Sequence, residues 1–330
     1  PQVGFRITPK RRRSPGGALL SWAFPTRSRA MTEPAPRRTV RPFDTERLLR
    51  ALDRLQAQRT FADAEDLQRF LDAWKGRPLD DVCQEAGSDP LEEAQDLAFQ
   101  ALETSNPTEA RERAARALAL DPGNVDARHA EALHCGEGPE ETADRLKVVA
   151  VEAEQALGAE FIQAEKGRLW NHLRARPYLR ARMALAVLLE RSGKPKEALP
   201  HFEALMRFSQ GDPQGVRVPL ARCLAVLGRF QPLKTLLETF PEDNTAIWAW
   251  LRVLERRQNG TDAEARSALG RARSHNAHVE AFLTARAKPP RERITPPEPG
   301  SPEEAALALR TLGPAWAPHR EALTWLMRQG

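Results

Sequence analysis

Residues 193–205 have the sequence GKPKEALPHFEAL, and their spacing decides the predicted fold. After the helix-breaking Gly193, a small side chain follows five residues later at Ala198, and larger apolar side chains follow at Phe202 and Leu205. Residues three and four apart lie on one face of an α-helix. The stretch therefore predicts a helix whose small residue lets a neighbouring helix approach closely and whose larger residues fill the groove behind it.

The same register recurs on both sides of this stretch. The equivalent inner positions are Ala110, Thr142, Ala198, Leu233 and Ala265. Their separations are 32, 56, 35 and 32 residues, so three of four are close to the roughly 34-residue period of the tetratricopeptide repeat. The remaining separation exceeds that period by about 22 residues. Because a pair of amphipathic helices cannot bury its apolar face alone, this period predicts an all-α, tetratricopeptide-like solenoid of about five stacked pairs.

The pattern divides the chain into three parts. Residues 1–40 are rich in proline and arginine and are predicted to be a disordered leader. Residues 41–90 contain two short amphipathic stretches and then, over 75–90, two glycines and two prolines, which predicts an N-terminal helical cap and a linker. Residues 91–330 hold the paired helices, and the excess residues form an insertion at about 155–176.

Residues 1–30 contain seven Lys or Arg residues and no acid, and three interpretations of them are open. They resemble an organelle transit peptide in composition, or a nucleic-acid-binding arm. The abrupt change of charge pattern at Met31 favours translated upstream sequence that is not part of the native protein. Without them the net charge of +5 becomes −2, so the basic pI does not indicate nucleic-acid binding by the remainder.

The composition also bears on compartment and chemistry. Three cysteines lie far apart without a CxxC, which favours the reducing cytoplasm. The longest apolar run, Met183–Leu189, is too short to span a membrane. His129 and His134 are five residues apart, whereas two metal ligands on one helix are typically four apart, and neither a phosphate-binding glycine loop nor a nucleophile motif occurs. We therefore expect no cofactor, no metal and no catalytic residues.

The insertion and the helix after it form the candidate binding site. Residues 168–182 contain five arginines, and Arg176 and Arg180 are four apart, hence on one helical face. Arg222 takes a comparable position on the next pair. The three arginines are predicted to form a fork-shaped anion site for a peptide carboxylate, a phosphopeptide or an acidic motif.

The alternative is a structural role, in which these arginines pair with acidic residues and fasten the insertion to the third pair. The acidic residues placed to form these pairs are Glu160, Glu165 and Glu190. On either interpretation, Glu165, Trp170 and Tyr178 are predicted to seal the junction between the insertion and the third pair.

Several short segments resemble a family of bacterial tetratricopeptide-repeat proteins that is similar in its C-terminal half to the suppressor-of-tumorigenicity-seven family. The segments are residues 165–170, 176–182, 212–217, 276–283 with Pro289-Pro290, and 303–305 leading to Trp316. The most specific of them is RPYLRAR at 176–182. The resemblance implies a repeat fold and assigns no catalytic residues.

Together these features predict a non-catalytic, cytoplasmic adaptor that binds a protein or peptide, with acidic character in the partner, along the concave face of the solenoid. A nucleic-acid-binding solenoid is the first alternative and is disfavoured by the near-neutral charge of residues 31–330. An enzyme subunit is the second alternative, supported only by the arginine and histidine content of residues 168–182.

Overall fold

The computed structural model describes residues 41–291 and 297–329, and no β-strand occurs within these residues. The predicted all-α class is confirmed, whereas the predicted leader, residues 1–40, lies outside the described residues. The described residues form seventeen α-helices and two short 3₁₀ helices: α1 (Asp44–Ala57), α2 (Ala64–Ala73), α3 (Leu79–Ala86), α4 (Pro90–Glu103), α5 (Pro107–Leu120), α6 (Val125–Leu133), α7 (Pro139–Leu157), α8 (Ala159–Ala164), η1 (Leu169–Asn171), η2 (Leu173–Ala175), α9 (Arg176–Arg191), α10 (Pro195–Phe208), α11 (Arg217–Val226), α12 (Phe230–Thr239), α13 (Ala246–Asn259), α14 (Asp262–Asn276), α15 (His278–Leu283), α16 (Pro302–Trp316) and α17 (Arg320–Met327).

Short polar side chains begin many of these helices. Asp89 and Asn106 accept hydrogen bonds from the free backbone N–H groups of α4 and α5, and each is followed by a proline at the first helical position. Thr261 and Glu264 form a reciprocal capping box at the start of α14. Because the first N–H groups of a helix have no partner within it, such caps fix where each helix restarts along the chain.

Helices α1, α2 and α3 form an N-terminal cap with a hydrophobic cluster of its own. Ala51 and Leu55 on α1 meet Phe70 on α2 and Val82 on α3 in this cluster. The helix α3 lies within residues 75–90, where a linker was predicted, so that prediction is wrong for Leu79–Ala86.

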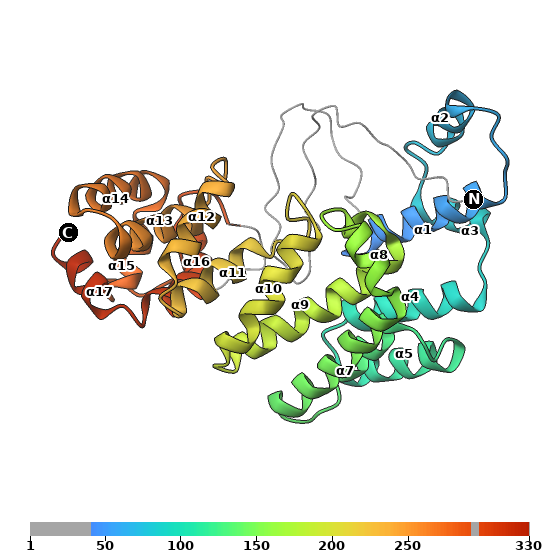
Figure 1. Ribbon diagram of the computed structural model, residues 1–330, viewed down its shortest axis with the longest axis horizontal. Coiled ribbons are helices and arrows are strands. Elements are labelled where there is room, and N and C mark those ends of the chain that lie inside the picture. Colours follow the sequence, from blue (N-terminus) through green and yellow to red (C-terminus); the bar gives the residue numbers. More distant parts are fainter. Residues whose placement is uncertain (1–40, 292–296, 330) are drawn as a thin grey trace.

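From α4 onward, consecutive helices pack in order along the chain, and the cap and the C-terminal helices lie at opposite ends of the molecule (Figure 1). Helices α4 and α5, α6 and α7, α9 and α10, α11 and α12, and α13 and α14 are neighbours in pairs. The predicted inner positions Ala110, Thr142, Ala198, Leu233 and Ala265 are all buried. The recurring sequence register therefore corresponds to the buried face of each second helix.

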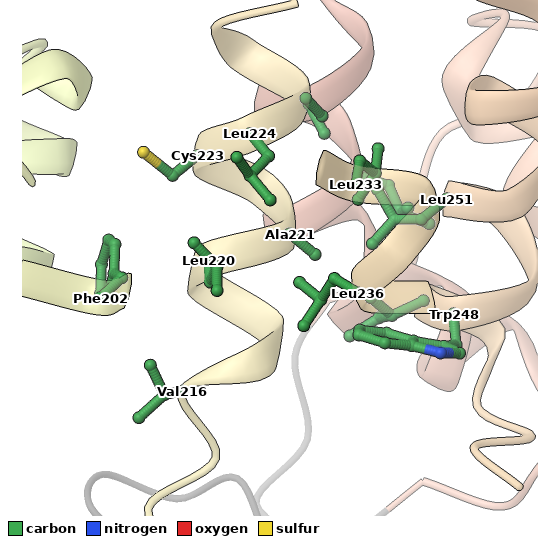
Figure 2. Packing of buried hydrophobic residues seen from close by; sticks show 14 of the residues in the cluster. Phe202, Val216, Leu220, Ala221, Cys223, Leu224, Leu233, Leu236, Trp248 and Leu251 are labelled. Carbon is green, nitrogen blue, oxygen red and sulfur yellow. The ribbon is translucent and has the colours of Figure 1, made fainter. Parts of the chain in front are cut away.

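Helix α11 shows how adjacent pairs meet (Figure 2). Phe202 of α10 lies on one side of α11 near Leu220, and Leu233 and Leu236 of α12 lie on its other side. All of these side chains belong to the largest hydrophobic cluster, which extends from α6 to α17. The apolar core is thus continuous across successive pairs over this part of the chain.

The glycines that mark the predicted helix breaks are required for two different reasons. Gly193 has φ of +76° and ends α9 with hydrogen bonds from Gly193 N to Glu190 O and from Lys194 N to Leu189 O, the Schellman arrangement. Gly260 has no positive φ, but a Cβ there would lie 2.9 Å from the backbone oxygen of Arg256. Gly193 is needed for its backbone conformation and Gly260 for close approach.

The C-terminal helices return toward the middle of the chain. Helix α16 contacts α11, α13 and α15, so it is not restricted to its immediate predecessor. Trp250 of α13 and Trp316 of α16 meet edge to face with centroids 6.5 Å apart, and both side chains are fully buried. His319, just before α17, is 2.7 Å from the backbone oxygen of Ala225 on α11. These contacts close the C-terminal helices into a compact group.

Helix α8 and the two 3₁₀ helices occupy the chain between α7 and α9. This segment is tied to the end of α10, because Gln210 N donates to Gly167 O at 2.9 Å and Arg168 forms an isolated bridge with Ser209. Within the described part of the chain, no helix has both the length and the apolar character needed to cross a bilayer.

Candidate functional site

The guanidinium group of Arg180 bridges two carboxylates from distant parts of the chain. Its Nη1 and Nη2 donate to Oε2 and Oε1 of Glu46 on α1 at 2.7 and 3.1 Å. Its Nε donates to Oδ1 of Asp126 on α6 at 2.9 Å, and Nη2 also donates to Oδ2. Arg180 is 1% exposed, Glu46 5% and Asp126 not at all. The planar guanidinium thus holds α1, α6 and α9 together in a site without access to solvent.

Arg176 lies one turn before Arg180 and faces the same carboxylate. Its Nη1 is 3.4 Å from Oε2 of Glu46, and its Nε donates to the backbone oxygen of Trp170 at 2.9 Å. The guanidinium also lies over the Trp170 ring, 5.1 Å from its centroid. The insertion therefore positions Arg176, and two of the three predicted arginines converge on one carboxylate that belongs to this chain.

Two stacked phenyl rings support the guanidinium of Arg180. The rings of Phe43, which precedes α1, and Phe99 of α4 are 4.4 Å apart and nearly parallel. The Arg180 Cζ lies 5.3 Å from the first centroid and 5.6 Å from the second. Such contacts favour a cation beside the aromatic rings and fix the plane of its side chain.

Polar side chains complete the surroundings of Asp126. Gln95 on α4 donates from Nε2 to Oδ2 of Asp126 at 2.8 Å. Asn124 donates from Nδ2 to Gln95 and accepts from the backbone N–H of Ala127, so it also caps α6. This matters because an unpaired polar group in a buried site costs free energy.

The pKa values follow from this pairing. Burial alone raises the pKa of Asp126, but the charge of Arg180 and its hydrogen bonds more than offset that effect, so the pKa lies below its usual value. Burial opposes the charge of Arg180, yet Asp126 and Glu46 together raise its pKa. With Arg176, the cluster contains two positive and two negative side chains. It is electrically balanced at neutral pH.

His129 lies one turn after Asp126 on α6 and is 3% exposed. Neither of its ring nitrogens has a hydrogen-bond partner within the described part of the chain. Burial lowers its pKa to about 4, against the opposing attraction of Asp126. The imidazole is therefore neutral at pH 7, and the balance of charge in the cluster does not depend on it.

Arg222 does not join the other two arginines. Its Nε donates to Oε1 of Glu190 at 2.8 Å, and its Nη2 donates to Oε2 of the same side chain. The structure therefore places one predicted candidate on α11 in a separate bidentate pair with the end of α9. The structural alternative predicted pairs with Glu160, Glu165 or Glu190. Among the three candidate arginines, only Arg222 forms such a pair, with Glu190.

The three predicted junction residues lie within the insertion or on α9, and their contacts are mostly within these two segments. Glu165 is 2.9 Å from Nε2 of His172, and this hydrogen bond lowers the pKa of Glu165. Trp170 lies beneath Arg176, as described above. Tyr178 is buried, accepts a hydrogen bond from Arg182, and has its pKa raised to about 12 by burial. They pack within the insertion and α9, and Tyr178 also reaches Phe208 of α10.

Two grooves lie between successive second helices. The first, of about 320 Å³, is lined mainly by apolar side chains of α10, α11 and α12: Glu203, Met206, Leu220, Leu224, Pro232, Thr235, Leu236 and Thr239. The second, of about 290 Å³, lies between α7, α9 and α10 and is lined by charged side chains around Leu185 and Leu189. In each, the first helix of the later pair forms the floor.

Sequence reasoning did not identify Glu46 and Asp126, the carboxylates that hold Arg180. Both stand in the first turn of a helix, where acidic residues are common because they complement the helix dipole. Nothing local distinguishes them from such residues. Within the described ranges, no group of three or more His, Cys, Asp or Glu side chains is arranged to hold a metal ion.

No protein-family model matches this chain, and the search of curated proteins also gave no match. The resemblance to bacterial tetratricopeptide-repeat proteins therefore stays a prediction.

Proposed function

We propose that the chain is a non-catalytic, cytoplasmic scaffold of tetratricopeptide-like helix pairs that binds a segment of another protein. The observation that carries the proposal is the apolar groove over α10, α11 and α12. The near-constant register of buried positions supports the repeat fold, because pairs stacked at this period share one core. Scaffolds of this kind bind extended or helical segments along grooves between their helices.

The groove has an apolar floor and an accessible rim. Leu220 and Leu224 on α11 form the floor, and Pro232 and Thr235 on α12 are exposed at the rim, opposite the half-buried Met206 of α10. Binding of a partner that inserts apolar side chains here would remove these atoms from water, the main source of affinity in such interfaces. The candidate arginines do not supply this surface, because carboxylates of the same chain hold their guanidinium groups.

A matched pair of variants tests the groove. Thr235 on α12 and Thr324 on α17 are both exposed helical threonines whose hydroxyl donates to the backbone oxygen four residues earlier. Thr235→Arg places a long cation across the groove, and Thr324→Arg makes the same change elsewhere. Residues 31–330, immobilised and incubated with native lysate, should retain a defined protein that Thr235→Arg loses and Thr324→Arg keeps, as measured by quantitative mass spectrometry.

Two outcomes would contradict the proposal. Equal retention by both variants would show that the groove is not the binding surface. Retention of nucleic acid in place of protein, with steep loss as salt rises, would favour the nucleic-acid alternative. The enzyme alternative would gain support from turnover of a substrate by the purified chain. That turnover must persist when contaminating nucleases and proteases are inhibited.

A further inference from the structure

The N-terminal cap meets the rest of the molecule mainly through charged side chains. Arg47 on α1 is 3.2 Å from Glu103 and 3.3 Å from Asp96. Arg50 and Arg54 both pair with Glu92 at the start of α4, at 2.9 and 2.6 Å. The hydrophobic cluster of the cap is separate from the clusters of α4 to α17. Docking of the cap therefore depends on ion pairs more than on a shared apolar core.

One buried contact anchors this polar interface. Glu46 reaches from α1 to Arg180 and Arg176 on α9, and Phe43 stacks on Phe99 next to it. The chain between the cap and α4 is short, and Gly87, which ends α3, has φ of +71° and open space where a Cβ would be. If the ion pairs of the cap part, the cap would therefore separate by turning about this short connection.

The site that Glu46 occupies would persist after its departure. Asp126 holds Arg180 through Nε and Nη2, so the buried guanidinium keeps a partner and its orientation. Arg176 keeps its bond to the backbone oxygen of Trp170 but loses its carboxylate. The remaining group of two arginines and one aspartate carries a net positive charge and has donors directed at the vacated position. Such an arrangement binds a carboxylate.

We infer that Arg176 and Arg180 form a carboxylate-binding site that Glu46 occupies within the chain, and that an acidic side chain of a protein partner takes this site when the cap separates. The inference rests on the proposed scaffold function and names the chemistry of a second contact with a partner. A covalently attached competitor acts at an effective concentration near the millimolar range, so an external ligand binds poorly until the cap is loosened.

A peptide with the sequence of residues 41–58 serves as the probe, because it contains the acidic residue and the flanking contacts that the site already accepts. We expect this labelled peptide to bind the Glu46→Gln chain about tenfold more tightly than the unmodified chain, in fluorescence anisotropy at low salt. The same peptide with Gln in place of its own glutamate should lose this gain. Arg176→Gln added to the Glu46→Gln chain should weaken binding of the acidic peptide.

A second variant loosens the cap and leaves Glu46, Arg176 and Arg180 unchanged. Arg47→Gln removes the pairs to Glu103 and Asp96 and leaves Glu46 in place, so it too should increase peptide binding, with helicity checked by circular dichroism. The inference would be overturned if the peptide bound equally to the unmodified, Glu46→Gln and Arg47→Gln chains. It would also be overturned if the acidic peptide and its glutamine version bound equally. The groove over α10 to α12 takes no part in this experiment, so its failure is separable from failure of the Thr235→Arg test.

Discussion

Replacing Arg180 by methionine should destabilise the fold far more than the same change at Arg176, one turn earlier. Methionine keeps most of the length of the side chain and removes its charge. At position 180 the change leaves Asp126 fully buried without its cationic partner and leaves Glu46 with Arg176 alone. Removing one partner of a buried ion pair typically costs about 3–5 kcal/mol. At position 176 Glu46 keeps Arg180, so the expected cost is about 1 kcal/mol.

Urea unfolding followed by far-ultraviolet circular dichroism measures both costs. The deficit of Arg180→Met should shrink as the pH falls from 7 to 4. Without Arg180, burial raises the pKa of Asp126, so the folded variant takes up a proton at higher pH than its unfolded chain does and gains stability as the pH falls. Equal losses for the two variants, or a deficit that stays constant over this pH range, would refute the assignment of Arg180 as a buried bridge.

Three further predictions concern other parts of the chain. His129 has a pKa of about 4 in the folded chain against 6.5 unfolded, so the free energy of unfolding should fall by about 3 kcal/mol from pH 7 to pH 4. Urea unfolding at each pH measures this fall, and the variant His129→Leu should make it smaller. Gly270 lies inside α14 with open space around it, so Gly270→Ala should stabilise by about 0.5–1 kcal/mol, whereas Gly260→Ala should destabilise because its methyl group would meet backbone at 2.9 Å; thermal melts distinguish the two. Cys223 is fully buried and burial raises its pKa to about 12, so it should react with Ellman's reagent much more slowly than the half-buried Cys135, and only at the rate of unfolding.

Helix positions from α4 onward were predictable because the signals are local. A glycine, a small residue and larger apolar residues at fixed intervals occur within one helix and its preceding turn. Local signals also explain why the prediction failed at α3, because Gly76 and Pro78 in the sequence suggest a loop. Pro78 in fact immediately precedes the helix and Gly87, with its positive φ, immediately follows it, so neither residue interrupts it. The two residues delimit a short helix, and an interpretation of the whole stretch as a linker overlooks this.

The partners of the candidate arginines show where prediction from the sequence stops. Glu190 and Arg222 are 32 residues apart, close to one repeat period, so the register of the pairs indicates the contact. Glu46 and Arg180 are 134 residues apart, and their contact depends on the cap folding back onto α4 and α9. No periodicity relates the cap to the pairs. A repeat pattern predicts contacts between neighbouring pairs and leaves contacts with a non-repeating element undetermined.

The polar character of the cap interface has a consequence for how the cap would leave. An apolar interface would expose carbon atoms to water on separation, at roughly 25 cal/mol for each Å². Ion pairs such as Arg50 with Glu92, which are about one fifth exposed, are instead solvated on both sides when they part, and salt weakens them. The bond between Glu46 and Arg180 is buried and largely unscreened, so salt alone loosens the outer contacts and leaves this one. A competing carboxylate is what replaces it, because Arg180 keeps Asp126 but the half-buried Arg176 is paired again only by another anion.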